Sequence, residues 1–434
     1  MDIAKLYQLF INSKGICTDT RKLKPNTIFF ALKGENFNGN EYALQALETG
    51  CNYAIIDEQI EVKNDALNHR LIKVTSGLKT LQKLANYHRK QFNIPVIGIT
   101  GSNGKTTTKE LIGEVLKQKY EILITQGNLN NHIGVPLTLL NLNSKHQIAI
   151  IEMGANKPGD INELATIAEP NYGLLTNIGK AHIEGFGSYE GVLKTKLELY
   201  KFIEKQKGTI IYNLNDEVLE NYLPKNCKLY TYAITNQKAD INGDLIEFNP
   251  CVNFKWHNTQ TQYISPPLKS NLVGEYNLTN ILAAICVGHI FDVSVDKINN
   301  AIENYTPSNN RSQITKTKNN TLIVDCYNAN PTSMLSALSS FKINPNPKLV
   351  ILGDMLELGH ISETEHQKIA DWLVDNNIQA YLIGDEFYKT NTKFKTFKNT
   401  THFIKNIDLK TMKNHIILLK GSRGIKLESL IELL

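Results

Sequence analysis

A glycine-punctuated segment, GITGSNGKTTT at residues 98–108, contains the residue types that hold a nucleotide phosphate. Glycines let backbone N–H groups close around phosphate oxygens, a lysine offsets their charge, and a hydroxyl reaches magnesium. The segment supplies these parts as follows: Gly101, Gly104, Lys105, and Thr106 or Thr107. A strict motif would have glycine where Ile99 stands, so the segment is a variant, and a plain glycine turn is the alternative interpretation.

Three further residues bear on a nucleotide bound with magnesium. Glu152 follows the apolar run QIAII, at the kind of strand end where ligands of open α/β sheets collect. His182 lies in the glycine-rich segment TNIGKAHIEGFGS, after another apolar run. The alternative interpretation of Glu152 is a solvated carboxylate, and that of His182 is a hydrogen-bonded surface imidazole. From its residue type and spacing alone, we expect Lys196 to be a solvated lysine on a helix that pairs with nearby glutamates.

The elements that must position these residues follow an α/β pattern. The apolar stretch before the phosphate segment predicts a strand, and TKELIGEVLKQK after it predicts a helix. The continuous apolar runs PVIGIT, QIAIIEMG, YGLLTNIG and GTIIYNLND are typical of a parallel sheet that is covered on both faces. A later set, NTLIVDCYN, PKLVILGD, AYLIGD and NHIILLKGS, is spaced by helices such as SETEHQKIADWLVDN and indicates a separate C-terminal α/β domain.

A smaller α/β domain precedes both sets. TIFFAL and NYAII predict strands, and EYALQALETG and SGLKTLQKLANYHRKQF predict helices. At 434 residues the chain exceeds one ordinary core. We predict three domains, with PSNNRS at 307–312 as a linker: 1–93, 94–307 and 308–434.

Composition narrows the class of function. The chain has 47 basic and 42 acidic residues, and neither sign forms a long run, which favours small-molecule substrates over nucleic acid. The first fifteen residues predict an amphipathic helix rather than a signal peptide or membrane span, so we expect a cytoplasmic protein without integral membrane association. The six cysteines lack any C-x-x-C pair, and we expect reduced, mostly buried thiols.

A series of segments, in order and spacing, resembles the Mur ligases of peptidoglycan synthesis over nearly the whole chain. They are TGSNGKTTT, GNLNNHIGVPLTLL, IEMGANKPGDI, TNIGKAHIEGFGS, KTKLELY, GEYNLTNILAAI, NNRSQI, DCYNANPTSM, GDMLELG and LLKGSRG. YNANPTSM and GDMLELG resemble the branch of the family that adds D-alanyl-D-alanine. The D-N-P-R motif expected of the diaminopimelate-adding branch is absent from the sequence.

The resemblance implies roles that chemistry alone leaves open. The implied positions are, for magnesium, Thr106, Glu152, His182 and Lys196; for catalysis, Lys105, His182 and Lys196; for ATP, Gly101, Ser102, Asn103, Gly104, Lys105, Thr106, Thr107, Asn280, Arg311 and Asp325; and for the other substrates, Thr20, Arg21, Asn128, Asn130, Asn131, Asn328 and Asn330. Lys196 matches a lysine that carbon dioxide carbamylates, and a carbamate offers magnesium oxygen ligands where an ammonium would be repelled. Tyr276 stands where the family commonly has histidine.

The fold implied by the resemblance has three α/β parts: a uridine-nucleotide domain, a central P-loop-type parallel-sheet ATPase domain, and a Rossmann-like domain that binds the dipeptide and ribose. The implied activity is ATP- and Mg²⁺-dependent joining of D-Ala-D-Ala to UDP-N-acetylmuramoyl-tripeptide through an acyl phosphate, for cell-wall synthesis, cell shape and division. We expect a monomer. The alternatives are another Mur-type or folylpolyglutamate-type amide ligase, a P-loop ATPase switch, or a precursor-binding protein.

Overall fold

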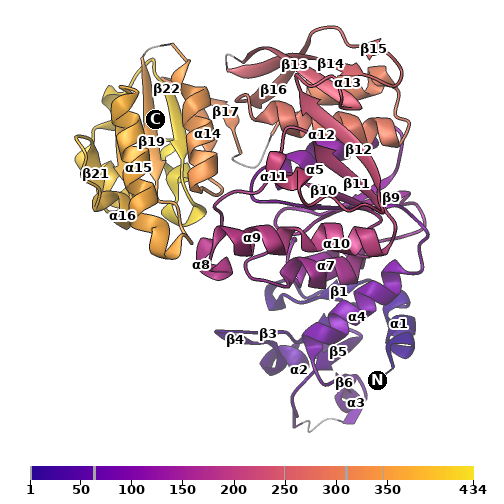
Figure 1. The fold of residues 1–434 in the computed structure, drawn as a ribbon. Coiled ribbons are helices and arrows are strands. Elements are labelled where there is room, and N and C mark those ends of the chain that lie inside the picture. The colour runs from indigo at the N-terminus through magenta and orange to yellow at the C-terminus, as the bar shows by residue number, and fades with distance from the viewer. Residues whose placement is uncertain (1, 62–64, 249, 308–310, 346) are drawn as a thin grey trace. The chain divides into compact units, whose positions relative to one another are not determined.

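The computed structural model describes residues 2–61, 65–248, 250–307, 311–345 and 347–434. Three main sheets follow one another along the chain, coloured from indigo to yellow in Figure 1. Two compact units are present: residues 1–99, 120–155 and 159–173 form the first, and residues 100–119, 156–158 and 174–434 form the second. The domain limits at 93/94 and 307/308 stay predictions, and residues 308–310 lie outside the described residues.

The first unit begins with a four-stranded parallel sheet in the order β1-β2-β5-β6. The strands are β1 (Ile16–Cys17), β2 (Ile28–Phe30), β5 (Tyr53–Ile56) and β6 (Leu71–Lys73), with a short hairpin of β3 (Lys33–Gly34) and β4 (Phe37–Asn38). The helices are α1 (Ile3–Ile11), α2 (Ala43–Glu48), α3 (Asp65–Asn68) and α4 (Gly77–Arg89). Phe29 and Ala54 pack with Ala46 and Leu47 of α2 in one buried cluster. The predicted N-terminal α/β arrangement is confirmed.

A ten-stranded sheet follows, and its strands run in the order β15-β14-β13-β12-β11-β10-β7-β9-β8, with β16 paired to β14. The strands are β7 (Val96–Thr100), β8 (Ile122–Ile124), β9 (Ile148–Glu152), β10 (Tyr172–Leu175), β11 (Thr209–Asn213), β12 (Lys228–Ile234), β13 (Ile241–Phe248), β14 (Cys251–Asn258), β15 (Tyr263–Ile264) and β16 (Leu268–Val273). Strands β7 and β9 pair in parallel, with Ile97 opposite Ile150, and both are buried along their length. This burial on both faces explains their continuous apolar runs.

The end of this sheet differs from the prediction of parallel strands. Strands β13 to β16 pair antiparallel, and β14 alternates partly exposed and buried residues along CVNFKWHN. Such alternation is typical of a strand with one covered face. The helices of this region are α5 (Lys105–Leu116), α6 (Gly134–Leu139), α7 (Asp160–Ala168), α8 (Ile183–Phe186), α9 (Tyr189–Lys196), α10 (Glu198–Lys205), α11 (Glu217–Glu220), α12 (Asn277–Ile290) and α13 (Val295–Asn304).

The third sheet, coloured orange to yellow in Figure 1, has the order β17-β18-β22-β19-β20-β21. The strands are β17 (Gln313–Lys316), β18 (Thr321–Asp325), β19 (Lys348–Gly353), β20 (Ala380–Ile383), β21 (Lys395–Phe397) and β22 (Ile416–Lys420), and the helices are α14 (Pro331–Lys342), α15 (Ser362–Asp375), α16 (Asp385–Tyr388) and α17 (Thr400–Asn406). Val350 and Leu352 pack with α14 and α15, whereas Leu349 and Ile351 face a second cluster that contains Phe403 of α17. Both faces are therefore covered, as the sequence predicted.

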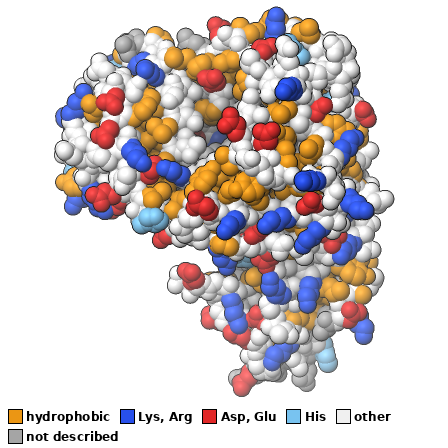
Figure 2. All heavy atoms as spheres, in the orientation of Figure 1, with side chains coloured by type: hydrophobic (Ala, Val, Ile, Leu, Met, Phe, Trp, Pro, Cys, Tyr) orange, Lys and Arg blue, Asp and Glu red, His pale blue; other side chains and the backbone are white. Residues whose placement is uncertain are grey.

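The surface and the cysteines agree with the sequence-based expectations. Figure 2 shows basic, acidic and hydrophobic side chains interspersed over the visible face. All six cysteines are free, and four of them are buried: Cys17, Cys51, Cys286 and Cys326. Within the described part of the chain, none of the helices has the length and apolar character needed to cross a membrane.

Candidate active site

The predicted phosphate-binding segment connects strand β7 to helix α5. Gly101 and Gly104 have φ angles of 143° and 78°, a left-handed region that side chains other than glycine rarely adopt. The loop then enters α5 at Lys105, so the N–H groups of the first turn of a 12-residue helix lie at the loop. Lys105 Nζ donates to the carbonyl oxygens of Gly101, at 2.7 Å, and Ser102, at 3.1 Å. These are the features that a phosphate cradle requires.

The residues after strand β10 hold the loop from one side. The Ser102 N–H donates to the Asn177 carbonyl at 2.9 Å, and Ser102 Oγ accepts from the Gly179 N–H at 2.9 Å. The Asn103 N–H donates to Asn177 Oδ1 at 3.0 Å, and Thr176 Oγ1 donates to the Asn103 carbonyl at 2.6 Å. Sequence reasoning assigned these partners no role. The signal was a polar Thr-Asn pair placed directly after a buried strand.

Asn280 on helix α12 packs beside the same loop. Its Oδ1 accepts from Thr108 Oγ1 at 3.1 Å, and its Nδ2 donates to Asn277 Oδ1 at 2.8 Å. A Cβ atom at Gly104 would lie only 2.7 Å from Asn280 Oδ1. The residue that the resemblance assigns to adenine therefore also ties α12 to α5.

Glu152 ends strand β9 in the first unit and is 1% exposed. Asn130 Nδ2 donates to its Oε1 at 2.8 Å. Asn131 Oδ1 accepts from the Gly134 N–H at 2.9 Å, which caps the start of α6, and Asn128 is exposed nearby in sequence. Within this unit, the predicted asparagine segment and the predicted acidic residue thus come into direct contact.

His182 and Lys196 lie in the second unit. His182 precedes α8 with φ of 54°, and its Nδ1 contacts a carboxylate oxygen of Glu357. The imidazole holds the pKa of Glu357 below its ordinary value. Lys196 ends α9, is 2% exposed, and has its Nζ 5.6 Å from the centroid of the Phe186 ring. The interpretation of Lys196 as a solvated helix residue is therefore wrong, because the side chain is buried.

The predicted magnesium residues are distributed over both units. Glu152 belongs to the first, whereas Thr106, His182 and Lys196 belong to the second. Thr106 is buried at the second position of α5, and Thr107 is partly exposed. Across the residues that the structure describes, no group of three or more His, Cys, Asp or Glu side chains is arranged to hold a metal ion.

Two predicted ATP residues flank the first strands of the C-terminal sheet. The guanidinium carbon of Arg311 lies 3.9 Å from the centroid of the Tyr327 ring. Asp325 Oδ2 accepts from Lys420 Nζ at 2.5 Å, and the Lys420 side chain is 2% exposed. Since a buried ammonium needs a counter-charge, Asp325 also has a structural role.

The YNANP segment meets the phosphate loop through Asn330. This residue caps helix α14 by accepting from the Ser333 N–H at 3.0 Å, and its Nδ2 donates to Asn103 Oδ1 at 2.7 Å. Asn328 is exposed, and its Oδ1 accepts from the Ala329 N–H at 2.9 Å. Asn330 is therefore engaged with the protein on both amide atoms, and Asn328 presents its side chain to solvent.

Thr20 and Arg21 form a short 3-10 turn after strand β1. Arg21 donates from Nε and Nη2 to the two carboxylate oxygens of Asp19, each at 2.9 Å, and its side chain is 86% exposed. This bidentate pairing lowers the pKa of Asp19 to about 2. The arginine is thus held on the surface with its outer edge in solvent.

Comparison with known proteins decides the family. Residues 12–89 match the Mur ligase family catalytic domain, residues 99–288 the Mur ligase middle domain, and residues 310–423 the Mur ligase glutamate ligase domain. A UDP-N-acetylmuramoyl-tripeptide–D-alanyl-D-alanine ligase of Bacillus subtilis is 33% identical, over 96% of this chain and 92% of its own. The chain belongs to the Mur ligase family.

Solved structures agree with this assignment. MurF from Acinetobacter baumannii matches this Mur ligase with a TM-score of 0.87 and 30% identity, covering 99% of this chain and 97% of its own. The MurF ligase of Thermotoga maritima, solved in complex with ADP, matches with a TM-score of 0.86 and 27% identity, covering 98% and 97%. The predicted three-part α/β fold is therefore confirmed.

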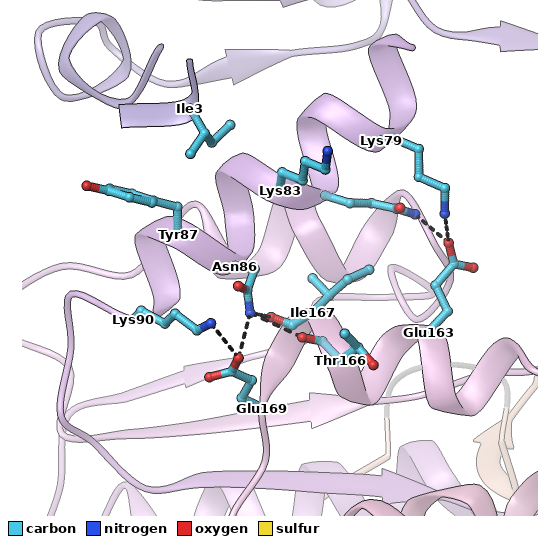
Figure 3. A pocket seen from close by; sticks show the side chains of 11 residues that line it. Ile3, Lys79, Lys83, Asn86, Tyr87, Lys90, Glu163, Thr166, Ile167 and Glu169 are labelled. Atoms are coloured by element: carbon cyan, nitrogen blue, oxygen red, sulfur yellow. Dashed lines mark hydrogen bonds and ion pairs between the residues drawn. The ribbon is translucent and has the colours of Figure 1, made fainter. Parts of the chain in front are cut away.

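A pocket of about 500 Å³ in the first unit of this Mur ligase contains none of the predicted residues. Figure 3 shows how polar contacts span it from α4 to α7: Lys79 pairs with Glu163 at 2.6 Å and Lys90 pairs with Glu169 at 2.8 Å. Asn86 Nδ2 lies between them and donates to the Ile167 carbonyl at 3.1 Å. These contacts join helix α4 to helix α7 and the residue that follows it.

Proposed function

We propose that this Mur ligase joins D-alanyl-D-alanine to UDP-N-acetylmuramoyl-tripeptide with ATP, giving the UDP-N-acetylmuramoyl-pentapeptide of peptidoglycan synthesis. Full-length similarity to a ligase of that name, 33% identical over 96% of the chain, carries the proposal. The glycine loop with Lys105 folded over it supports a nucleotide substrate, as does the ADP complex of the Thermotoga maritima relative. In this proposal residues 1–93 bind the uridine nucleotide, 94–307 bind ATP, and 308–434 bind the dipeptide and ribose.

The reaction takes place in two steps. First, the terminal carboxylate of the tripeptide attacks the γ-phosphorus of ATP, the bond from that phosphorus to the β–γ bridging oxygen breaks, and ADP leaves. Second, the amine of D-alanyl-D-alanine attacks the acyl carbon, inorganic phosphate leaves with the bonding electron pair, and the amine loses a proton. The protein forms no covalent bond to substrate, so its contribution is alignment and charge stabilisation.

The phosphate loop supplies the charge stabilisation. In this proposal the N–H groups at the start of α5 and the Lys105 ammonium stabilise the negative charge that moves from the γ-phosphoryl group to the departing ADP. Lys105 exchanges its bonds to the loop carbonyls for phosphate oxygens. Arg311 adds a second cation from the C-terminal part of the chain.

In this proposal four residues would hold a magnesium ion: Thr106, Glu152, His182 and a carbamylated Lys196. Three of them would offer the hydroxyl, carboxylate and carbamate oxygens that magnesium prefers, and His182 would add an imidazole nitrogen. When bound, the ion neutralises charge on the phosphate oxygens. Lys196 suits carbamylation because it is buried at the end of α9, where an oxygen-bearing anion can face a cation.

The remaining predicted residues are assigned to the two other substrates. Thr20, Arg21 and the asparagines beside Glu152 bind the uridine-linked tripeptide. Asn328 contacts the dipeptide directly because it is exposed, whereas Asn330 shapes the site from the cap of α14. The availability of ATP and of the uridine-nucleotide precursor places the reaction in the cytoplasm, and we propose that one chain suffices.

Phosphate release by the purified protein with ATP and magnesium tests this function. We expect release only when both UDP-N-acetylmuramoyl-tripeptide and D-alanyl-D-alanine are present, and a lower rate when a single D-amino acid or L-lysine replaces the dipeptide. Release with neither acceptor would instead indicate an ATPase switch. Release that prefers a single amino acid would indicate another amide ligase.

A further inference from the structure

Arg311 stacks on an aromatic ring from its own domain. Its guanidinium carbon lies 3.9 Å from the centroid of Tyr327, well within the range of a cation–π contact. Both side chains are partly buried. A guanidinium that lies over a ring face keeps its N–H donors at its edge, where they can still reach an anion.

Arg311 and Tyr327 lie just beyond the paired residues of the C-terminal sheet. Strands β17 and β18 are antiparallel, with Gln313 opposite Val324. Arg311 lies two residues before Gln313, and Tyr327 lies three residues after Val324, so both extend the same strand pair at one end. Continued in register, Arg311 would pair with Cys326, and successive side chains of a strand point to opposite faces. The strand pair therefore brings the two segments to the same end of the sheet, and the backbone beyond the paired residues sets the contact itself.

The neighbouring residue, Ser312, is held independently. Ser312 has φ of 51°, a left-handed conformation that is uncommon for serine, and it is 7% exposed. Its Oγ shares a hydrogen bond of 2.7 Å with the hydroxyl of Tyr276. Burial raises the pKa of Tyr276, so its hydroxyl keeps its proton for this bond at neutral pH.

We infer that Tyr327 is a positioning residue that holds the Arg311 side chain in the conformation from which it contacts the phosphates of ATP. This inference rests on the proposed function, which places Arg311 at the nucleotide. A long arginine side chain loses rotamer freedom when it binds a phosphate, and stacking removes part of that freedom beforehand. The hydrogen bond between Tyr276 and Ser312 holds the residue next to Arg311. The Tyr327 ring and this hydrogen bond together restrict the conformation of the Arg311 side chain.

The alternative role for Tyr327 is direct contact with the dipeptide, because it belongs to the same YNANP segment as Asn328. The two roles differ in the substrate that responds. A residue that acts through Arg311 changes the kinetics with ATP and has no effect once Arg311 is removed. A residue that contacts the dipeptide changes the KM for D-alanyl-D-alanine whether or not Arg311 is present.

A double-variant cycle with the full-length enzyme separates these roles. The variants are Tyr327→Leu and Tyr327→Met, which remove the ring, Tyr327→Phe, which keeps it, and Arg311→Ala alone and combined with Tyr327→Leu. Initial rates of phosphate release are measured against ATP and against D-alanyl-D-alanine, and thermal unfolding of each variant checks folding. Tyr327 is only partly buried, so we expect the protein to fold without the ring. The second ring-free variant replaces the first if that one does not fold.

We expect the ring-free variants to lower kcat/KM for ATP by about 10-fold, the size of a partly desolvated cation–π contact. Tyr327→Phe should stay within about 2-fold of the parent, because the ring face remains. In the Arg311→Ala background, Tyr327→Leu should change kcat/KM for ATP by less than about 2-fold.

Additive losses in the double variant, or a change confined to the KM for D-alanyl-D-alanine, would overturn the inference while leaving the ligase function in place. If Arg311→Ala leaves the ATP kinetics unchanged, the assignment of Arg311 fails together with the inference. Whether phosphate release requires both UDP-N-acetylmuramoyl-tripeptide and D-alanyl-D-alanine tests the proposed function independently of this inference.

Discussion

Gly101 is constrained by both its backbone angle and its neighbour. Its φ is 143°, and an added Cβ atom would lie 2.0 Å from Thr176 Oγ1, the hydroxyl that bonds to the Asn103 carbonyl. A side chain at this position must therefore distort the phosphate loop or break its contact with the end of β10. The glycine is needed for the shape of the cradle, and the lysine for its charge.

Substitution of this glycine should act mainly on nucleotide binding. We expect Gly101→Ala to weaken ATP binding at least about 10-fold, since the loop N–H groups move away from the phosphates. Gly15→Ala is the matched control, because Gly15 has φ of 111° but no atom within 4 Å of an added Cβ. Isothermal titration with ATP should show the loss in the first variant alone, and equal affinities would contradict the cradle.

Lys196 permits a second test at a single residue. If its carbamate is required, removal of dissolved carbon dioxide should lower the phosphate-release rate several-fold, and added bicarbonate should restore it. Lys196→Ala should have a low rate that bicarbonate does not change. Equal rates of the parent enzyme in depleted and supplemented buffer would show that the unmodified amine suffices.

At the level of elements, the sequence predicted most of what the structure contains. Continuous apolar runs identified the parallel strands because burial on both faces imposes that pattern. The antiparallel strands β13 to β16 were missed, although CVNFKWHN carries the alternation of a half-covered strand. Two contacts were not predicted: the hydrogen bonds of Thr176 and Asn177 to the phosphate loop, and the stacking of Arg311 on Tyr327. Both depend on which segments meet in space, and local sequence patterns do not encode that.

The loop after strand β19 also depends on a residue that is distant from it in sequence. His366 of α15 is fully buried, its Nε2 accepts from the Met355 N–H at 3.0 Å, and its Nδ1–H donates to the Ser362 carbonyl at 2.7 Å. Asp354 Oδ1 accepts from the Phe387 N–H at 2.9 Å and so fixes the start of α16. The neutral imidazole is what joins α15 to this loop.

This arrangement predicts a loss of stability in mild acid. Burial lowers the pKa of His366, and protonation would also break the bond from the Met355 N–H. Because the folded pKa lies below the unfolded value of about 6.5, the stabilisation is complete above that pH and falls below it, by up to about 1.4 kcal/mol per pH unit. Burial raises the pKa of the neighbouring Asp354, which opposes this trend at lower pH.

Thermal unfolding between about pH 5.5 and 7.5 checks this expectation. The parent protein should lose melting temperature as the pH falls through this range. His366→Gln, which keeps an acceptor for the Met355 N–H but cannot titrate, should have a flatter profile. Parallel profiles for the two proteins would assign the pH dependence to other groups.

For the whole molecule, we expect a single chain to be the functional form. The exposed large hydrophobic residues of the described chain, from Ile11 to Leu433, belong to many different helices, strands and connecting segments. Apolar side chains that are exposed singly need no partner. Sedimentation equilibrium at micromolar concentration should give a mass of 48.9 kDa, with or without ATP. A mass of twice that value would show that a second copy contributes.

Helix α5, which begins at the phosphate loop, packs against α12 in the second unit. About 160 residues separate the end of α5 from the start of α12, which at roughly 5–20 residues per second is on the order of ten to thirty seconds of translation. During that interval the apolar face of α5 has emerged from the ribosome without its partner. The nucleotide site is thus completed late in synthesis, only after α12 has been made.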